Sequence, residues 1–196
     1  MNLKTFVKVG NVSNLSDARY CAGFGVNMIG FNLDSNQEDA IDTTTAHEIM
    51  GWVAGVDFVM EYGSMALDQI DAVHDSENPA YIQVDTVAVA NQLTELSYKV
   101  IFRLTESHID QTGLLDQLSP QVKFVLVESE SDYDHIKSQI GSIKILRGYD
   151  LTPDNIGEIV DTAAYYGIGL LGSHEEKPGF KDYDELADIL EVLEID

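Results

Sequence analysis

Basic residues and cysteine are scarce in this chain of 196 residues, and each shortage excludes a class of protein. There are 11 Lys and Arg against 34 Asp and Glu, so the formal net charge is −23. A surface of that sign repels polyanions, which argues against nucleic acid or an anionic membrane surface as a partner. Cys21 is the only cysteine, so an internal disulfide is excluded and a reducing, cytoplasmic location is expected.

Long apolar runs are also missing. No run approaches the roughly 20 residues of a membrane-spanning helix, and the amino terminus lacks the charged and apolar regions of a signal peptide. Apolar residues make up 44% of the chain, a usual content for a globular protein. We therefore expect one domain over residues 1–196, with its acidity explained by solubility or salt adaptation rather than by a basic partner.

Short apolar stretches recur eight times along the chain, and a helical pattern follows each of them. Such alternation of apolar strands and helices predicts a parallel sheet. Eight units close most economically into a single (β/α)8 TIM barrel, an α/β fold. An open doubly wound sheet is the alternative, although no Gly-x-Gly-x-x-Gly phosphate loop follows the first stretch. The expected strands cover residues 6–10, 27–32, 56–61, 80–84, 98–104, 122–127, 143–147 and 168–171.

Polar residues at the expected helix starts predict three caps. Ser13 or Asn14 can cap the first helix, and one of residues 43–45 can cap the second. Thr152 can cap the seventh, because Pro153 directly after it suits a first helical turn.

Four segments spread along the chain have a recognisable wording: residues 7–18 (VKVGNVSNLSDA), 81–85 (YIQVD), 151–155 (LTPDN) and 166–182 (YGIGLLGSHEEKPGFKD). Together they resemble the phosphoribosylanthranilate isomerase family of tryptophan biosynthesis. The resemblance implies the same barrel fold and an isomerase that needs no cofactor. The family reaction is an Amadori rearrangement of a phosphoribosylated anthranilate, which requires a general base and a general acid facing each other across the barrel mouth.

Both catalytic positions of the family are altered in this chain. The family's general base, a cysteine on the first strand, falls on Gly10, and its general acid, an aspartate ending the sixth strand, falls on Val127. Asp85 and Glu128 are the candidate substitutes; the alternative is that both are solvated carboxylates of the barrel rim. Glu128 can face the site only if the sixth strand ends early, because neighbouring residues of a strand point to opposite faces.

The family's substrate-binding positions are altered as well. Its strand-four histidine falls on Asp85, its phosphate-facing glycines fall on Tyr149 and Asp150, and its strand-eight aspartate falls on Gly169. A tyrosine and a carboxylate at the glycine positions block the backbone and repel a phosphate. We therefore expect the family's isomerase activity to be lost or much reduced.

Ligand-binding candidates remain at the carboxyl ends of the strands, where barrel sites are built. Arg147 is the favoured residue for binding an anion, and a salt bridge to Asp150 or Glu128 is the alternative. Arg103 could also bind an anion or form a salt bridge, with less support. The expected contacts to a small, anionic ligand are Asn11, Arg147, Gly148, Gly172 and Ser173.

Three further residues have interpretations of their own. Lys8 alternates with Gly10 and should point into the barrel, where a buried, ion-paired structural role is favoured over catalysis. Cys21 is expected to pack in the core. Trp52 is expected in the shell between helices and barrel, with stacking on a flat ligand as the alternative. No cluster of Cys, His and carboxylates has metal-ligand spacing, so no metal site is expected.

Three functions remain open, because a fold alone does not carry chemistry. The first is an active isomerase with catalytic groups relocated to Asp85, Glu128 or His174. The second is a barrel whose mouth binds another small molecule. The third is a non-catalytic partner subunit, which a closed mouth with Tyr149 packed into it would favour. A homodimer is a further expectation.

Overall fold

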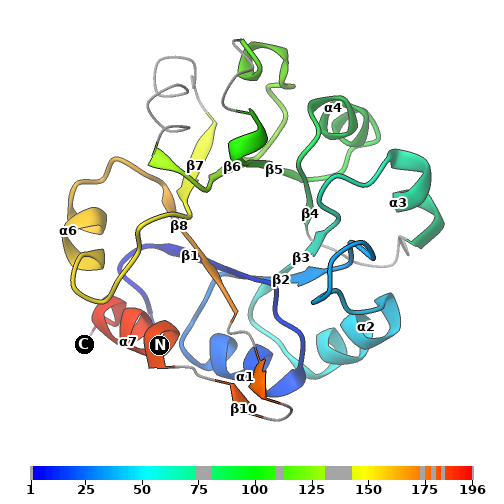
Figure 1. Ribbon diagram of the computed structural model, residues 1–196. Helices are drawn as coiled ribbons and strands as arrows, with labels where there is room; N and C mark the ends of the chain where they lie inside the picture. The colour runs from blue at the N-terminus through cyan, green and yellow to red at the C-terminus, as the bar shows by residue number, and fades with distance from the viewer. Residues whose placement is uncertain are drawn as a thin grey trace.

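Strand β1 (Phe6–Gly10) pairs with β2 (Met28–Asn32) on one side and with β8 (Gly167–Leu171) on the other, which closes the sheet. All eight strands are parallel neighbours in chain order, and the helices form a ring around them (Figure 1). This computed structural model confirms the TIM barrel and excludes the open doubly wound sheet. The structure describes residues 2–73, 81–108, 113–130, 143–172, 175–177, 180–181 and 184–195.

The strands agree closely with the sequence-based prediction. Each ends at the predicted residue, and the starts differ by at most two residues. The remaining strands of the barrel are β3 (Asp57–Glu61), β4 (Tyr81–Val84), β5 (Val100–Leu104), β6 (Phe124–Val127) and β7 (Lys144–Arg147).

The helical layer departs from a regular repeat after β5. Two short 3₁₀ turns, η1 (Glu106–His108) and η2 (Leu115–Gln117), lie there in the described part of the chain, and the helix expected after β6 falls at residues 131–142, outside it. A small antiparallel hairpin of β9 (Glu175–Lys177) and β10 (Phe180–Lys181) follows β8. The α-helices are α1 (Leu15–Gly23), α2 (Thr43–Trp52), α3 (Leu67–Val73), α4 (Val87–Glu95), α6 (Ile156–Asp161) and α7 (Asp184–Leu193). Within the described residues, no helix has the length and hydropathy to cross a membrane.

One of the three cap predictions is confirmed. The Asn14 side chain accepts a hydrogen bond from the backbone N–H of Asp17 at 3.0 Å and caps α1. The cap of α2 is Asp42 rather than a threonine: its Oδ1 accepts from Thr45 N at 2.7 Å, and a carboxylate is favoured at a helix start. The cap prediction for Thr152 is wrong, because its own N–H donates to Asn155 Oδ1 and α6 begins after that turn.

Alternate residues of most strands belong to two different cores. One core fills the space between strands and helices, and the other fills the barrel itself with Met28, Val59, Ile101, Phe124, Leu126 and Leu146. At the amino ends of the strands, Phe6 and Phe124 stack at 5.3 Å, with Tyr81 and Tyr166 against them. The barrel is therefore filled at its amino end, and polar residues take over toward its carboxyl end.

Trp52 is not in the shell between helices and barrel: its side chain is 71% exposed, so that prediction is wrong. The buried residues of α2 are Ala46 and Ile49, and Val53 continues this face directly after the helix. Trp52, the last residue of the helix, is therefore left on the solvent side.

Cys21 is buried as predicted, and we expect its thiol to be unreactive in the native protein. It is 1% exposed, and burial is the main reason why its pKa rises to about 12. Because only the thiolate attacks a disulfide reagent, labelling at neutral pH should be at least about a hundredfold slower than in urea. Fast labelling without denaturant would contradict the buried placement.

Candidate functional site

A cavity of about 430 Å³ opens at the carboxyl ends of the strands, the end at which barrel enzymes carry their sites. Its size lies in the usual range for small-molecule sites, roughly 300–1,000 Å³. Each strand supplies a residue of the wall, from the strand itself or directly after it: Lys8, Asn32, Glu61, Gln83, Arg103, Leu126, Gly148 and Gly169. The mouth is therefore open rather than filled.

Glu61, at the end of β3, lies over Gly30 of the neighbouring strand β2 and over Gly10 of β1, the next strand along. A Cβ placed on Gly10 would lie 2.7 Å from Glu61 Oε1, and a Cβ on Gly30 would lie 2.1 Å from the same atom. The carboxylate thus occupies the space that side chains at positions 10 and 30 would take. Glu61 is not among the residues predicted from the sequence, although a carboxylate ending the apolar strand 56–61 was a usable signal.

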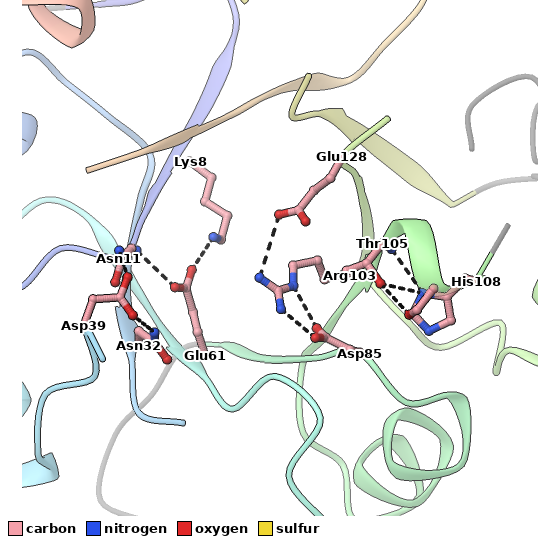
Figure 2. A network of polar contacts seen from close by, with 11 residues as sticks. Lys8, Asn11, Asn32, Asp39, Glu61, Asp85, Arg103, Thr105, His108 and Glu128 are labelled. Atoms are coloured by element: carbon pink, nitrogen blue, oxygen red, sulfur yellow. Dashed lines mark hydrogen bonds and ion pairs between the residues drawn. The ribbon is translucent and has the colours of Figure 1, made fainter. Parts of the chain in front are cut away.

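Glu61 forms a buried ion pair with Lys8, whose side chain is 2% exposed (Figure 2). Lys8 Nζ donates to Oε1, and the backbone N–H of Asn11 donates to Oε2 at 3.0 Å. Asn11 has a φ of 55°, the left-handed conformation that asparagine tolerates better than most residues. The prediction of a buried, ion-paired Lys8 is confirmed, and both oxygens of Glu61 have donors.

The side chain of Asn11 connects this pair to the loop after β2. Its Nδ2 donates to one oxygen of Asp39, and Asn32 Nδ2 donates to the other at 2.9 Å (Figure 2). Asn11 therefore lines the cavity, as predicted for a ligand contact, and is held by Glu61 and Asp39 together.

A second charged group stands on the opposite side of the mouth. Arg103, at the end of β5, donates to both oxygens of Asp85, at 2.9 and 2.6 Å, and its Nη1 lies 3.8 Å from Glu128 Oε1 (Figure 2). Burial alone would lower the pKa of Arg103, but the bonds to Asp85 and the nearby carboxylates raise it overall. The arginine therefore stays protonated, and both oxygens of Asp85 are bound to it in a bidentate ion pair.

Glu128 faces the cavity because it continues the alternation of side chains along β6. Leu126 belongs to the core inside the barrel, Val127 belongs to the core under the helices, and Glu128 lines the cavity. The expectation that Glu128 needs an early strand end is therefore wrong: β6 ends at Val127, as predicted, and Val127 is the residue that points away from the site. Burial raises the pKa of Glu128 above its ordinary value, because this effect is larger than the opposing attraction of Arg103, which lowers it. Glu128 is therefore the carboxyl group of the mouth best suited to carry a proton.

Arg147 lies away from the cavity. Its guanidinium stacks on the Tyr149 ring at 4.2 Å, and its Nε donates to the Tyr149 carbonyl at 3.0 Å. Among the described residues, Glu128 pairs with Arg103, and Arg147 forms no ion pair with Asp150. The structure thus reverses the order of the two arginine candidates: Arg103 lines the cavity and Arg147 does not.

The backbone amides of Gly148 and Gly172, two of the predicted ligand contacts, already donate hydrogen bonds within the protein. Gly148 lines the cavity, but its N–H donates to Val127 O at 2.8 Å, and Gly172 N–H donates to Gly10 O at 2.7 Å. Ser173 and His174 lie outside the described residues. Tyr149 is buried, but it packs under the helices with its hydroxyl 2.8 Å from that of Tyr165, so it does not close the mouth.

Metal-binding geometry is not found at this mouth. Over the part of the chain that the structure describes, no three His, Cys, Asp or Glu side chains are grouped so that they could hold a metal ion. The carboxylates of the mouth are paired instead with Lys8, Arg103 and asparagine side chains.

Comparisons with known proteins agree with the resemblance of the four sequence segments. The chain is 24% identical over 194 residues, 93% of either sequence, to the N-(5'-phosphoribosyl)anthranilate isomerase of Citrifermentans bemidjiense. Among solved structures it is similar to the phosphoribosyl anthranilate isomerase of Thermus thermophilus, with a TM-score of 0.77, 17% identity, and coverage of 96% of this chain and 98% of that one.

A second solved structure is a phosphoribosyl anthranilate isomerase in complex with reduced 1-(o-carboxyphenylamino)-1-deoxyribulose 5-phosphate. Its TM-score is 0.75 at 17% identity, and the match covers 96% of this chain and 98% of that one. No sequence-family profile matches the chain. The chain is therefore a relative of the phosphoribosylanthranilate isomerases, as the four sequence segments indicated.

Proposed function

We propose that this barrel binds a small molecule at its mouth and has lost most or all of the family's isomerase activity. The observation that carries the proposal is the Glu61 carboxylate, which lies beside Gly10 in the space of the family's catalytic side chain. Position 10 offers no group to remove a proton. Glu61 itself accepts hydrogen bonds from Lys8 and from Asn11 N, so both of its oxygens are occupied.

The charges of the mouth support the same proposal. Its two cations, Lys8 and Arg103, are each paired with a carboxylate of the chain. Four carboxylates line the cavity: Asp34, Asp39, Glu61 and Glu128. A phosphate ester entering here meets a negative field without a free cation among these groups, and neither Gly148 N–H nor Gly172 N–H is available to it.

Turnover of phosphoribosylanthranilate by the purified protein tests the proposal. We expect a kcat/KM at least about a thousandfold below that of a working isomerase, the usual cost of losing one acid–base group. The enzyme from Thermus thermophilus is the positive control, and a folded circular dichroism spectrum must accompany the result. Rescue of a tryptophan auxotroph, or turnover within about tenfold of the control, would contradict the proposal.

An isomerase with a relocated proton carrier is the second candidate, because Glu128 combines a position in the cavity with a raised pKa. Asp85 is a poorer carrier, since both of its oxygens bind Arg103. This second candidate requires a substrate other than the phosphate ester, and it predicts that Glu128→Gln abolishes turnover of that substrate while binding persists.

The raised pKa of Glu128 also predicts a pH dependence of stability. Its contribution to the free energy of unfolding is full below the unfolded pKa of about 4.3 and is lost as the pH rises through the folded pKa. Glu128→Gln removes this loss. The free energy of unfolding of the variant, compared with that of the wild type at the same pH, should therefore be higher at about pH 8 than at about pH 5. Urea unfolding at both pH values measures the gain, and the exposed Glu48→Gln should show none.

A further inference from the structure

Two buried acceptor atoms of the cavity have no partner. Among the described residues, Asn11 Oδ1 and Gln83 Oε1 are the buried side-chain polar atoms without a hydrogen bond. Gln83 is 3% exposed, and both residues line the cavity. Buried polar atoms are nearly always paired, because an unpaired one loses its water without replacement. These two atoms are therefore open positions for donors that the protein itself does not supply.

The chemical identity of the Asn11 atom follows from its neighbour. The amide nitrogen of Asn11 faces the Asp39 carboxylate, which can only accept a hydrogen bond when it is ionised. The other amide atom must then be the oxygen, so the open position of Asn11 is an acceptor. A ligand that satisfies it needs an N–H or O–H group.

The charge around these two acceptor atoms favours a positively charged ligand. Glu128 lines the cavity, and its described ion pair with Arg103 is long, at 3.8 Å. Lys8 is paired with Glu61, and four carboxylates line the cavity against two cations, so the cavity retains more negative than positive charge. A metal ion would satisfy the charge, but the described carboxylates are not grouped to coordinate one.

We propose that the cavity takes a small organic ammonium compound bearing hydroxyl or amino donors, rather than a phosphate ester. The proposal rests on small-molecule binding at the mouth and names the ligand class for it. The ligand's donors bind Gln83 Oε1 and Asn11 Oδ1, and its positive charge faces Glu128. This replaces the expectation of an anionic ligand, which depended on Arg147.

Glucose and two derivatives, each changed at one position of the sugar, separate the alternatives. Glucosamine carries an ammonium group, glucose is neutral, and glucose 6-phosphate is an anion. A compound that binds the native state raises the midpoint of thermal unfolding, and titration calorimetry then gives its Kd. We expect glucosamine to bind at least about tenfold more tightly than glucose, because a hydrogen bond to a charged group adds to the affinity. Glucose 6-phosphate should bind least.

Variants of the wall give a second readout. Glu128→Gln should weaken glucosamine about tenfold and leave glucose unchanged, since one charge contact is lost. Glu48→Gln, on the exposed side of α2, changes the net charge equally and should leave both affinities unaltered. Gln83→Met removes the buried acceptor at similar side-chain length and should weaken both sugars.

The outcomes separate the two proposals. Tightest binding by glucose or by glucose 6-phosphate would overturn the ammonium class and leave small-molecule binding intact. An equal loss of glucosamine affinity in Glu128→Gln and Glu48→Gln would also overturn it, because the effect would then come from net charge. If none of the sugars binds, and putrescine as a second ammonium probe does not bind either, the ligand class and small-molecule binding at the mouth are both overturned, whereas the loss of isomerase activity is decided by the turnover assay.

Discussion

Replacing Lys8 with Met is expected to lower the free energy of unfolding by about 3–5 kcal/mol, the usual cost of leaving one buried charge unpaired. Lys8 is 2% exposed and holds Glu61, which in turn lies over Gly10 and Gly30. Without the ammonium group, the buried Glu61 carboxylate keeps only the Asn11 N–H of its two described donors. In a chain of this size the melting temperature should fall by about 6–20 °C.

The double variant Lys8→Met with Glu61→Gln is the matched control. It removes both charges, while the amide oxygen of the glutamine can still accept from Asn11 N. Its stability should lie above that of Lys8→Met alone, because replacing a whole buried pair is far less costly than breaking it. Equal losses in the single and double variants would show that Lys8 contributes packing and not charge.

Gly167→Ala should be comparably severe, because it acts where the barrel closes. Gly167 pairs with Phe6 in the register of β8 and β1, and a Cβ on it would lie 2.2 Å from the Phe6 carbonyl oxygen. That atom belongs to the backbone of the neighbouring strand, so it cannot rotate away as a side chain can. We expect a loss of about 3 kcal/mol or more in urea unfolding.

Gly51→Ala provides the comparison for this prediction. Gly51 lies in α2, and a Cβ on it would meet no atom within 4 Å, so alanine there should be neutral or stabilise by about 0.5–1 kcal/mol. A stability of Gly167→Ala close to that of Gly51→Ala would mean that β1 and β8 can separate locally at little cost.

The barrel could be predicted from the sequence, because eight apolar stretches at regular spacing leave few alternatives. The direction of individual side chains was harder. In a parallel barrel both faces of a strand are buried and apolar, so hydrophobicity alone does not distinguish inside from outside. Arg147 and Arg103 illustrate this: both lie at the carboxyl end of a strand, but only Arg103 alternates with a residue of the inner core, Ile101.

The site was predictable where the chain itself supplied a reference. Lys8 was placed correctly because it lies two residues before Gly10 on the same strand, so both residues face the inside of the barrel. Glu61 was missed because its contact partner, Lys8, is 53 residues away in sequence, and no local pattern records such a pairing. Glu128 was doubtful because the resemblance put Val127 at the site, whereas Leu126 belongs to the inner core and Val127 to the core under the helices.

The glycines of the mouth have a consequence for how this pocket can change. Glu61 fills the space over Gly10 and Gly30, and Leu126 fills the space over Gly148 and Gly169, where a Cβ would lie 3.0 and 2.5 Å from its Cδ1. Two long side chains of the wall therefore occupy the space that the glycines of nearby strands leave open, and they limit the cavity there. Shortening Leu126 alone would lengthen the chamber toward β7 and β8, so new ligand sizes lie one substitution away from the present shape.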